Sequence, residues 1–188
     1  MSETIRVDVH PPASVFERFP AESAGWTLQG DWQPNLAERR ASWDLLVELL
    51  TRITVVPLGD NEGLLREALA SLHAIFGVTR EILKRHGPDL AAERRGELSF
   101  AVMSAHLLNR MLRPVTASWH PRLRAWEVEH GTASAPTQAV EMAWEHHDSL
   151  RELLKALQGM LSQYTAVLAA ACDAEEFRRI LHEGFRAS

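Results

Sequence analysis

Cysteine is nearly absent from this sequence, which has only Cys172 among its 188 residues. One thiol forms no internal disulfide and supplies too few ligands for a cysteine-based zinc site. Long hydrophobic runs are missing as well, because the longest apolar stretch, residues 166–172, is far shorter than the ~20 residues that span a bilayer. The first ten residues interleave charged and apolar positions, so we expect no secretory signal and a cytoplasmic protein.

An excess of basic charge is also lacking. Twenty Lys and Arg stand against 25 Asp and Glu, which gives a formal net charge of −5. This balance provides no general attraction to nucleic acid or to an anionic membrane, and we expect neither as a partner. A hydrophobic fraction of 46% and a charged fraction of 24% are typical of a globular protein. The length predicts a domain that buries a sizeable core by itself.

The sequence lacks the common catalytic motifs: Gly-x-Ser-x-Gly, the phosphate-binding loop and Gly-x-Gly-x-x-Gly. Its only Glu-x-x-His match starts at Glu127, whereas a di-iron bundle needs two. We therefore expect no cofactor and no resident metal. A metal or small-ligand site assembled across helices, for example from His73, His106 and His147, stays open as an alternative. The carboxylates at 141, 145, 148 and 152 are interpreted as a solvated helix face.

Beyond residue 34, apolar residues recur every three or four positions, as in amphipathic helices. Asn35 and Glu38 have capping-box spacing, and so do Asp173 and Glu176. Proline and glycine mark the expected ends. Helices are predicted from Asn35 to before Pro57, from near Asn61 to Gly87, from near Gly96 to a kink or break at Pro114, from Pro121 to Gly131, from about Val140 to Cys172, and from Asp173 onwards. The predicted fold is an all-α antiparallel bundle with four long and two short helices.

Residues 1–34 differ from the bundle domain, residues 35–188, because they hold four of the nine prolines. Ile5, Val7 and Val9 alternate with polar residues as in a half-buried strand, but no partner strand is evident. We interpret the segment as an irregular arm. Its aromatic residues are expected to pack on the bundle; they are Phe16, Phe19, Trp26 and Trp32.

The densest local feature lies between Asn109 and Glu127, where prolines, tryptophans and basic residues gather. Trp and Arg are enriched where proteins bind one another, so this stretch is a candidate partner-binding surface. The alternative is that Trp119 and Trp126 anchor the core while the prolines bend the helix. The candidate residues are Arg110, Arg113, Trp119, His120, Arg124 and Trp126.

Arg113 and His120 are separated by six residues. This spacing resembles the motif of HEPN domains, helical bundles in which an Arg and a His act together at a dimer cleft. The resemblance implies a ribonuclease with Arg113 and His120 as catalytic residues. Pro114 stands where that family usually has a polar residue, and similar spacings at Arg66/His73, Arg80/His86 and Arg124/His130 bring the total near the number expected by chance.

Residues 71–83 and 112–121, with Leu112-Arg113-Pro114 and Trp119-His120-Pro121, resemble helical proteins of high-GC bacteria found beside or fused to components of conflict or defence systems. The resemblance covers roughly residues 40–130 and brings no catalytic residue. It implies an accessory or adaptor bundle that works with a larger partner. We therefore expect a non-enzymatic interaction module that binds a protein and is able to self-associate. The alternatives are the HEPN-like ribonuclease and the metal- or small-ligand-binding bundle.

Overall fold

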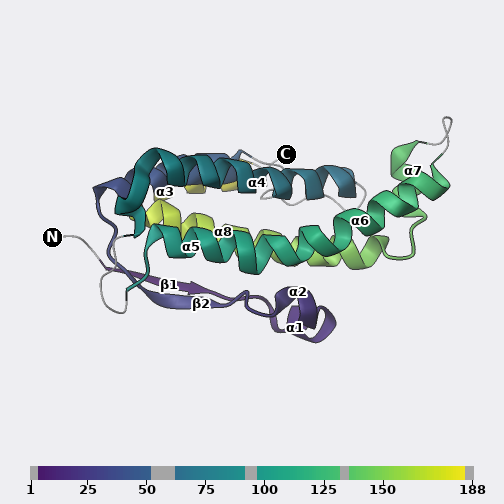
Figure 1. Cartoon of the computed structure of the whole chain (residues 1–188), viewed down its shortest axis with the longest axis horizontal. Coiled ribbons are helices and arrows are strands. Elements are labelled where there is room, and N and C mark those ends of the chain that lie inside the picture. Colours follow the sequence, from purple (N-terminus) through teal and green to yellow (C-terminus); the bar gives the residue numbers. More distant parts are fainter. Residues whose placement is uncertain (1–3, 52–61, 92–96, 132–135, 185–188) are drawn as a thin grey trace.

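The computed structural model describes residues 4–51, 62–91, 97–131 and 136–184, with side chains to residue 179. The described chain is mostly helical, as predicted. Figure 1 shows the four long helices side by side along the long axis of the molecule. Their apolar stripes meet in one core, in which Leu46, Leu69 and Leu161 are fully buried. The long helices are α3 (Leu36–Leu50), α4 (Leu65–His86), α6 (Arg113–His130) and α8 (His147–Ala171).

The third predicted helix does not break at its prolines. α5 (Phe100–His106) continues through a π-helical segment, η3 (Leu107–Leu112), into α6. The prediction of a separate helix beginning at Pro121 is wrong, because Pro121 lies inside α6. Pro114 falls in the first turn of α6, directly after η3. A π turn is wider than an α turn, so the chain accommodates the proline ring at that point without ending the helix.

The prediction of an irregular N-terminal arm is also wrong. β1 (Ile5–Val9) pairs antiparallel with β2 (Leu28–Trp32), with Val7 opposite Gly30. The short helices α1 (Ala13–Arg18) and α2 (Pro20–Ser23) connect the two strands. The alternation of Ile5, Val7 and Val9 did indicate a strand, but its partner was hidden because β2 contains polar residues and a glycine.

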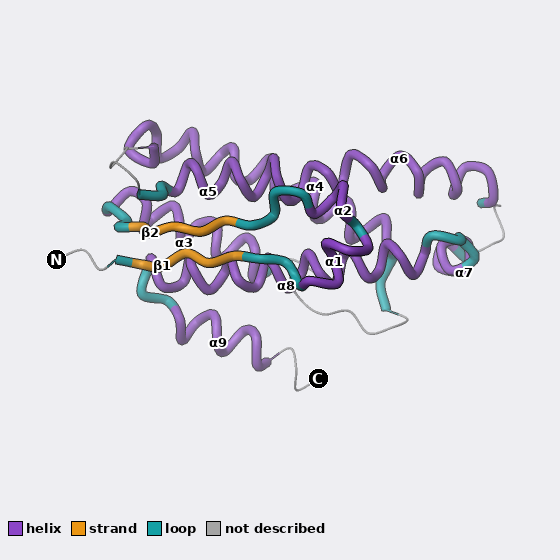
Figure 2. Tube along the Cα trace, turned by 90° about the horizontal axis from the view of Figure 1, so that it is seen from below, coloured by secondary structure: helices purple, strands orange, loops and turns teal. Residues whose placement is uncertain are grey.

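This N-terminal unit lies along the bundle, as Figure 2 shows. The backbone of His10 exchanges two hydrogen bonds, each 3.0 Å, with the side chain of Gln163 on α8. Trp26 and Trp32 are fully buried and Phe19 is buried, which confirms the expected packing for these three aromatics. Phe16 departs from that expectation, since 41% of its surface is exposed.

Glu38 ties the N-terminal unit to the bundle. The predicted capping box is confirmed, because Asn35 Oδ1 accepts from the Glu38 backbone N–H and Glu38 Oε2 accepts from the Asn35 N–H, both at 2.9 Å. The other carboxylate oxygen accepts from Trp32 Nε1 at 3.2 Å and from the Phe100 backbone N–H at 2.8 Å. This buried carboxylate therefore joins β2, α3 and α5, and its partners satisfy both of its oxygens.

The pattern from Val140 to Cys172 predicted one helix, but the structure divides it into α7 (Thr137–Met142) and α8. A turn at 143–146 separates them, and it buries Trp144 against Trp119 with the ring centroids 6.1 Å apart. Trp144 packs from this turn, yet its spacing from the neighbouring apolar residues is the one expected on a helix stripe. The apolar pattern alone therefore gave no sign of the break.

The remaining helix ends are mostly as expected. α4 ends at Gly87, whose φ of +70° favours glycine, and the 3-10 helix η2 (Gly87–Ala91) follows. Asn61, the expected start of α4, lies outside the described residues. The last helix, α9 (Glu175–Gly184), is confirmed. Asp173, the expected capping residue, lies two positions before this helix with a φ of +56°, and its carboxylate accepts from Arg39 at 2.9 Å.

No helix in the described part of the chain is long and apolar enough to cross a membrane.

Candidate functional site

The two candidate tryptophans are packing residues. Trp119 is only 4% exposed, and its indole Nε1 donates to Glu22 of α2 at 3.2 Å. Trp126 is half-buried and donates from Nε1 to the Val140 carbonyl at 2.7 Å, which fixes α7 against α6. These contacts agree with the core-anchor alternative for both side chains.

The candidate basic residues lie on the other side of the same helix. Arg110, Arg113 and Arg124 are exposed and His120 is half-buried. Consecutive residues of an α-helix are rotated by about 100°, so His120 points well away from the neighbouring Trp119. Arg113 and Arg124 are eleven residues apart, which is about three full turns, so they project in the same direction, and Arg110 lies three residues before Arg113, in η3.

α4 and α6 run beside each other, and three side chains of each meet along their line of contact. From one end to the other, the guanidinium of Arg113 lies over the Phe76 ring at 5.9 Å, the His120 and His73 ring centroids are 6.3 Å apart, and Arg66 Nη1 is 3.6 Å from Glu127 Oε1. Residues 113, 120 and 127 repeat every seven positions, which is the spacing that keeps contacts in line between nearly parallel or antiparallel helices. We call these six residues the α4–α6 seam.

His120 is the titratable group at the centre of the seam. Burial lowers its pKa, and the neighbouring His73 lowers the pKa further because two imidazolium charges repel each other. The neutral form of His120 is therefore favoured at neutral pH. A neutral imidazole keeps one N–H donor and one acceptor nitrogen available to a ligand.

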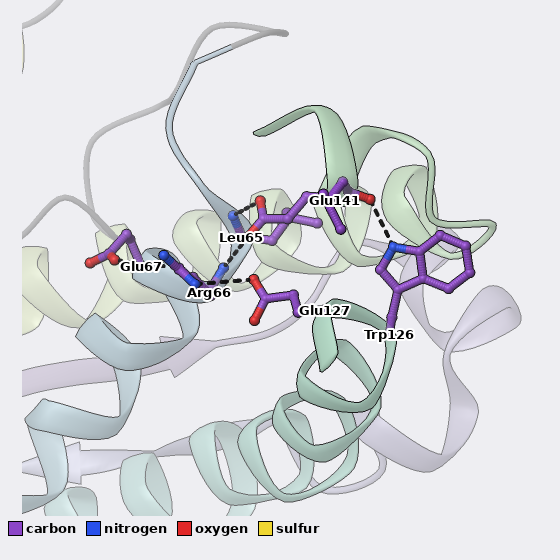
Figure 3. Close-up of polar contacts among 7 residues, drawn as sticks. Leu65, Arg66, Glu67, Trp126, Glu127 and Glu141 are labelled. Atoms are coloured by element: carbon purple, nitrogen blue, oxygen red, sulfur yellow. Dashed lines mark hydrogen bonds and ion pairs between the residues drawn. The ribbon is translucent and has the colours of Figure 1, made fainter. Parts of the chain in front are cut away.

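At the far end of the seam, two carboxylates meet the start of α4 (Figure 3). Glu141 of α7 is 2% exposed, and its oxygens accept from the backbone N–H groups of Leu65 at 2.7 Å and Arg66 at 3.1 Å. These are unpaired donors of a helix N-terminus, so Glu141 caps α4 from another helix. Burial raises the pKa of Glu127, Arg66 lowers it, and the adjacent Glu141 raises it.

The interpretation of residues 141, 145, 148 and 152 as a solvated face is therefore wrong for Glu141. These residues do not share a helix, because the turn at 143–146 separates α7 from α8. Nothing in the local sequence around Glu141 indicates that it caps α4. The only signal was the absence of a good capping residue at Leu64, the residue before α4.

His106 differs from His120 in its surroundings. Its Nδ1 is 2.6 Å from the buried hydroxyl of Tyr164, and its Nε2 is 2.9 Å from the Gly25 carbonyl. The carbonyl only accepts, so Nε2 donates to it, and Nδ1 of the neutral ring accepts from the tyrosine hydroxyl. Burial lowers the pKa of His106 and raises the pKa of Tyr164. His106 thus holds the N-terminal unit against α8.

Two grooves flank the exposed Trp43, one of about 520 Å³ between α3 and α4 and one of about 450 Å³ beside Cys172. Asp44, which borders both, accepts from Arg85 at 3.1 Å and pairs with His86 at 2.9 Å. Burial raises the pKa of the Cys172 thiol to about 11, so this cysteine stays protonated and is a poor nucleophile.

The structure does not bring together the three histidines that the sequence suggested as a metal or small-ligand site. His73, His106 and His147 have different neighbours, namely His120, Tyr164 and Asp148. The described residues contain no group of three or more His, Cys, Asp or Glu placed to hold a metal ion. Of the four Arg/His spacings, two have residues in the seam: Arg66/His73 and Arg113/His120.

Comparison with known proteins adds no identification. No protein-family model, curated protein or solved structure matches this chain. The resemblance of residues 40–130 to helical proteins associated with defence systems therefore stays a prediction.

Proposed function

We propose that this protein is a non-enzymatic interaction module that binds an acidic segment of a partner protein. The binding surface consists of four exposed arginines, Arg80 on α4 together with Arg110, Arg113 and Arg124 on the η3–α6 helix. We call them the arginine face. The observation that carries the proposal is that none of the four has a carboxylate partner among the described residues.

Four arginines elsewhere in the described chain do pair with carboxylates. Arg6 pairs with Asp31, Arg18 with Glu152, Arg39 with Asp173 and Arg85 with Asp44. The chain has more carboxylates than basic groups, so internal partners are abundant. Guanidinium groups that remain uncompensated in such a chain create a local positive patch that attracts a negatively charged partner.

The shape of the arginine face suits an extended partner. Arg110 and Arg124 are separated by about 21 Å along the helix axis, at 1.5 Å per residue. A peptide needs about six or seven extended residues to cover this distance. Arginine also forms paired hydrogen bonds with carboxylates, which makes it a frequent anchor of protein interfaces. Self-association stays a prediction, which sedimentation of the purified protein would test.

The experiment measures binding of a fluorescent glutamate-rich peptide by anisotropy. R80E/R110E/R124E should weaken binding at least tenfold, and rising salt should weaken the wild-type complex. The matched control is R40E/K84E/K155E, which makes the same change in net charge at exposed positions outside the face and should keep near-wild-type binding. Equal losses in both triple variants, or no peptide binding by the wild type, would refute the proposal.

A ribonuclease is the second proposal, and the position of His73 supports it. Two histidines that face each other across the seam can in principle serve as general acid and general base, beside an arginine that binds phosphate. Purified wild-type protein should then cleave single-stranded RNA, and His120→Ala should abolish cleavage. Cleavage that His120→Ala removes would overturn the non-enzymatic proposal.

A further inference from the structure

Most described histidine rings have a partner. His86 contacts Asp44, His106 contacts Tyr164, His130 stacks on Trp126, and His147 contacts Asp148. His73 and His120 face each other across the seam, and neither ring has a hydrogen-bond partner among the described residues. Their planes are inclined by 64°, so the two rings do not stack flat on each other.

Arg113 lies at one end of the seam and is connected to the histidine pair through Phe76. Its guanidinium is over the Phe76 ring, and Phe76 in turn contacts His73, with the ring centroids 5.7 Å apart. A contact with an aromatic ring uses no N–H group of arginine in a hydrogen bond, so these donors stay available. They are the part of arginine that binds an oxyanion through two hydrogen bonds.

The three side chains favour an anion over a cation. The permanent charge of Arg113 opposes binding of a metal ion nearby. Two facing imidazoles repel each other when both are protonated, and an oxyanion between them removes this repulsion. The other charged groups of the seam, Arg66 and Glu127, already pair with each other. A dianion with several oxygens matches this donor set better than a carboxylate, which has only two.

We infer that His73, Arg113 and His120 form a binding subsite for a phosphoryl group, presented by a phosphorylated side chain on the partner protein. The inference rests on the proposed acidic partner, because the subsite adjoins the arginine face and shares Arg113 with it. It adds a chemical specificity: a phosphorylated acidic peptide should bind more tightly than the same peptide without phosphate.

The test compares three fluorescent probes: an acidic peptide with one phosphoserine, the same peptide with serine, and a short single-stranded RNA. We expect wild-type protein to prefer the phosphopeptide to the serine peptide by about tenfold. H73Q/H120Q should remove the preference, so that this variant binds the two peptides equally. The control is His10→Gln, which changes an exposed histidine outside the seam.

Nuclear magnetic resonance of the histidine rings gives a second readout. Inorganic phosphate should shift the His73 and His120 signals and leave the His106 signals in place. Zinc that shifts these two rings when phosphate does not would overturn the inference, and so would tighter binding of RNA than of the phosphopeptide. Equal binding of both peptides refutes the phosphoryl subsite alone, whereas failure of every peptide to bind also refutes the proposed function.

Discussion

His106 and His120 lie about four turns apart on one continuous helix, yet they belong to different kinds of region. His106 uses both ring nitrogens to join the N-terminal unit to α8. His120 has no hydrogen-bond partner within the described chain and faces another histidine. Burial lowers the pKa of both. The direction of a pKa shift therefore does not separate a structural histidine from a candidate ligand-binding one, whereas the partners of the ring do.

The π-helical segment η3 lies between the two histidines. A π turn contains about one residue more than an α turn, so it rotates the following helix face by roughly 100°. Without it, residues 106 and 120 would project in nearly the same direction. With it, His106 contacts α8 and His120 contacts α4.

The largest predicted effect on stability comes from replacing His106, whose two ring nitrogens both have partners. His106→Ala leaves the Tyr164 hydroxyl buried without its acceptor and removes the contact with Gly25. We expect a loss of about 2–4 kcal/mol in the free energy of unfolding, measured with urea. His120→Ala is the matched control on the same helix and should cost less than about 1 kcal/mol. Similar losses for the two variants would contradict the distinction.

Tyr164→Phe tests the same hydrogen bond by removing its donor. It removes the buried hydroxyl and leaves the His106 acceptor without a donor, at a cost of about 1–2 kcal/mol. Combined with His106→Ala in a double-mutant cycle, it should show a coupling of about 0.5–3 kcal/mol, whereas Tyr164→Phe with His120→Ala should be additive.

The pH dependence of stability follows from the lowered pKa of His106. The unfolded chain binds more protons than the native state once the pH falls below about 6.5, so stability decreases as the pH falls through this value towards the native pKa. The contribution is complete above pH 6.5. The difference in unfolding free energy between wild type and His106→Ala should therefore shrink between pH 7.5 and pH 5. A difference that stays constant would contradict a neutral, bonded His106.

The smallest predicted effect concerns the seam. Arg113→Ala removes an exposed cation that contacts the Phe76 ring, and it should lower the free energy of unfolding by at most about 1 kcal/mol. The free energy of binding to the acidic peptide should fall by much more than the free energy of unfolding does. A loss of several kcal/mol would show that Arg113 is a structural residue.

Several features of the fold were predictable because their signals are local. The cap at Asn35, the end of α4 at Gly87 and the end of α6 at Gly131 depend on residues within a few positions of one another. The strand partner of β1, the continuity of the helix through Pro114 and the turn before α8 depend on distant contacts. The outward arginines and inward tryptophans of α6 follow from helical rotation, but the sequence did not show which helix they meet.

By itself, the sequence determined the helical class, most of the apolar stripes and the caps whose donors and acceptors are close in the chain. Tertiary structure alone decided that His73 faces His120, that Glu141 caps α4 and that Glu38 joins three elements. The physical reason is that helix propensity and capping act within one or two turns. Side chains from different helices meet only after packing and a single π turn have set the rotation of each face.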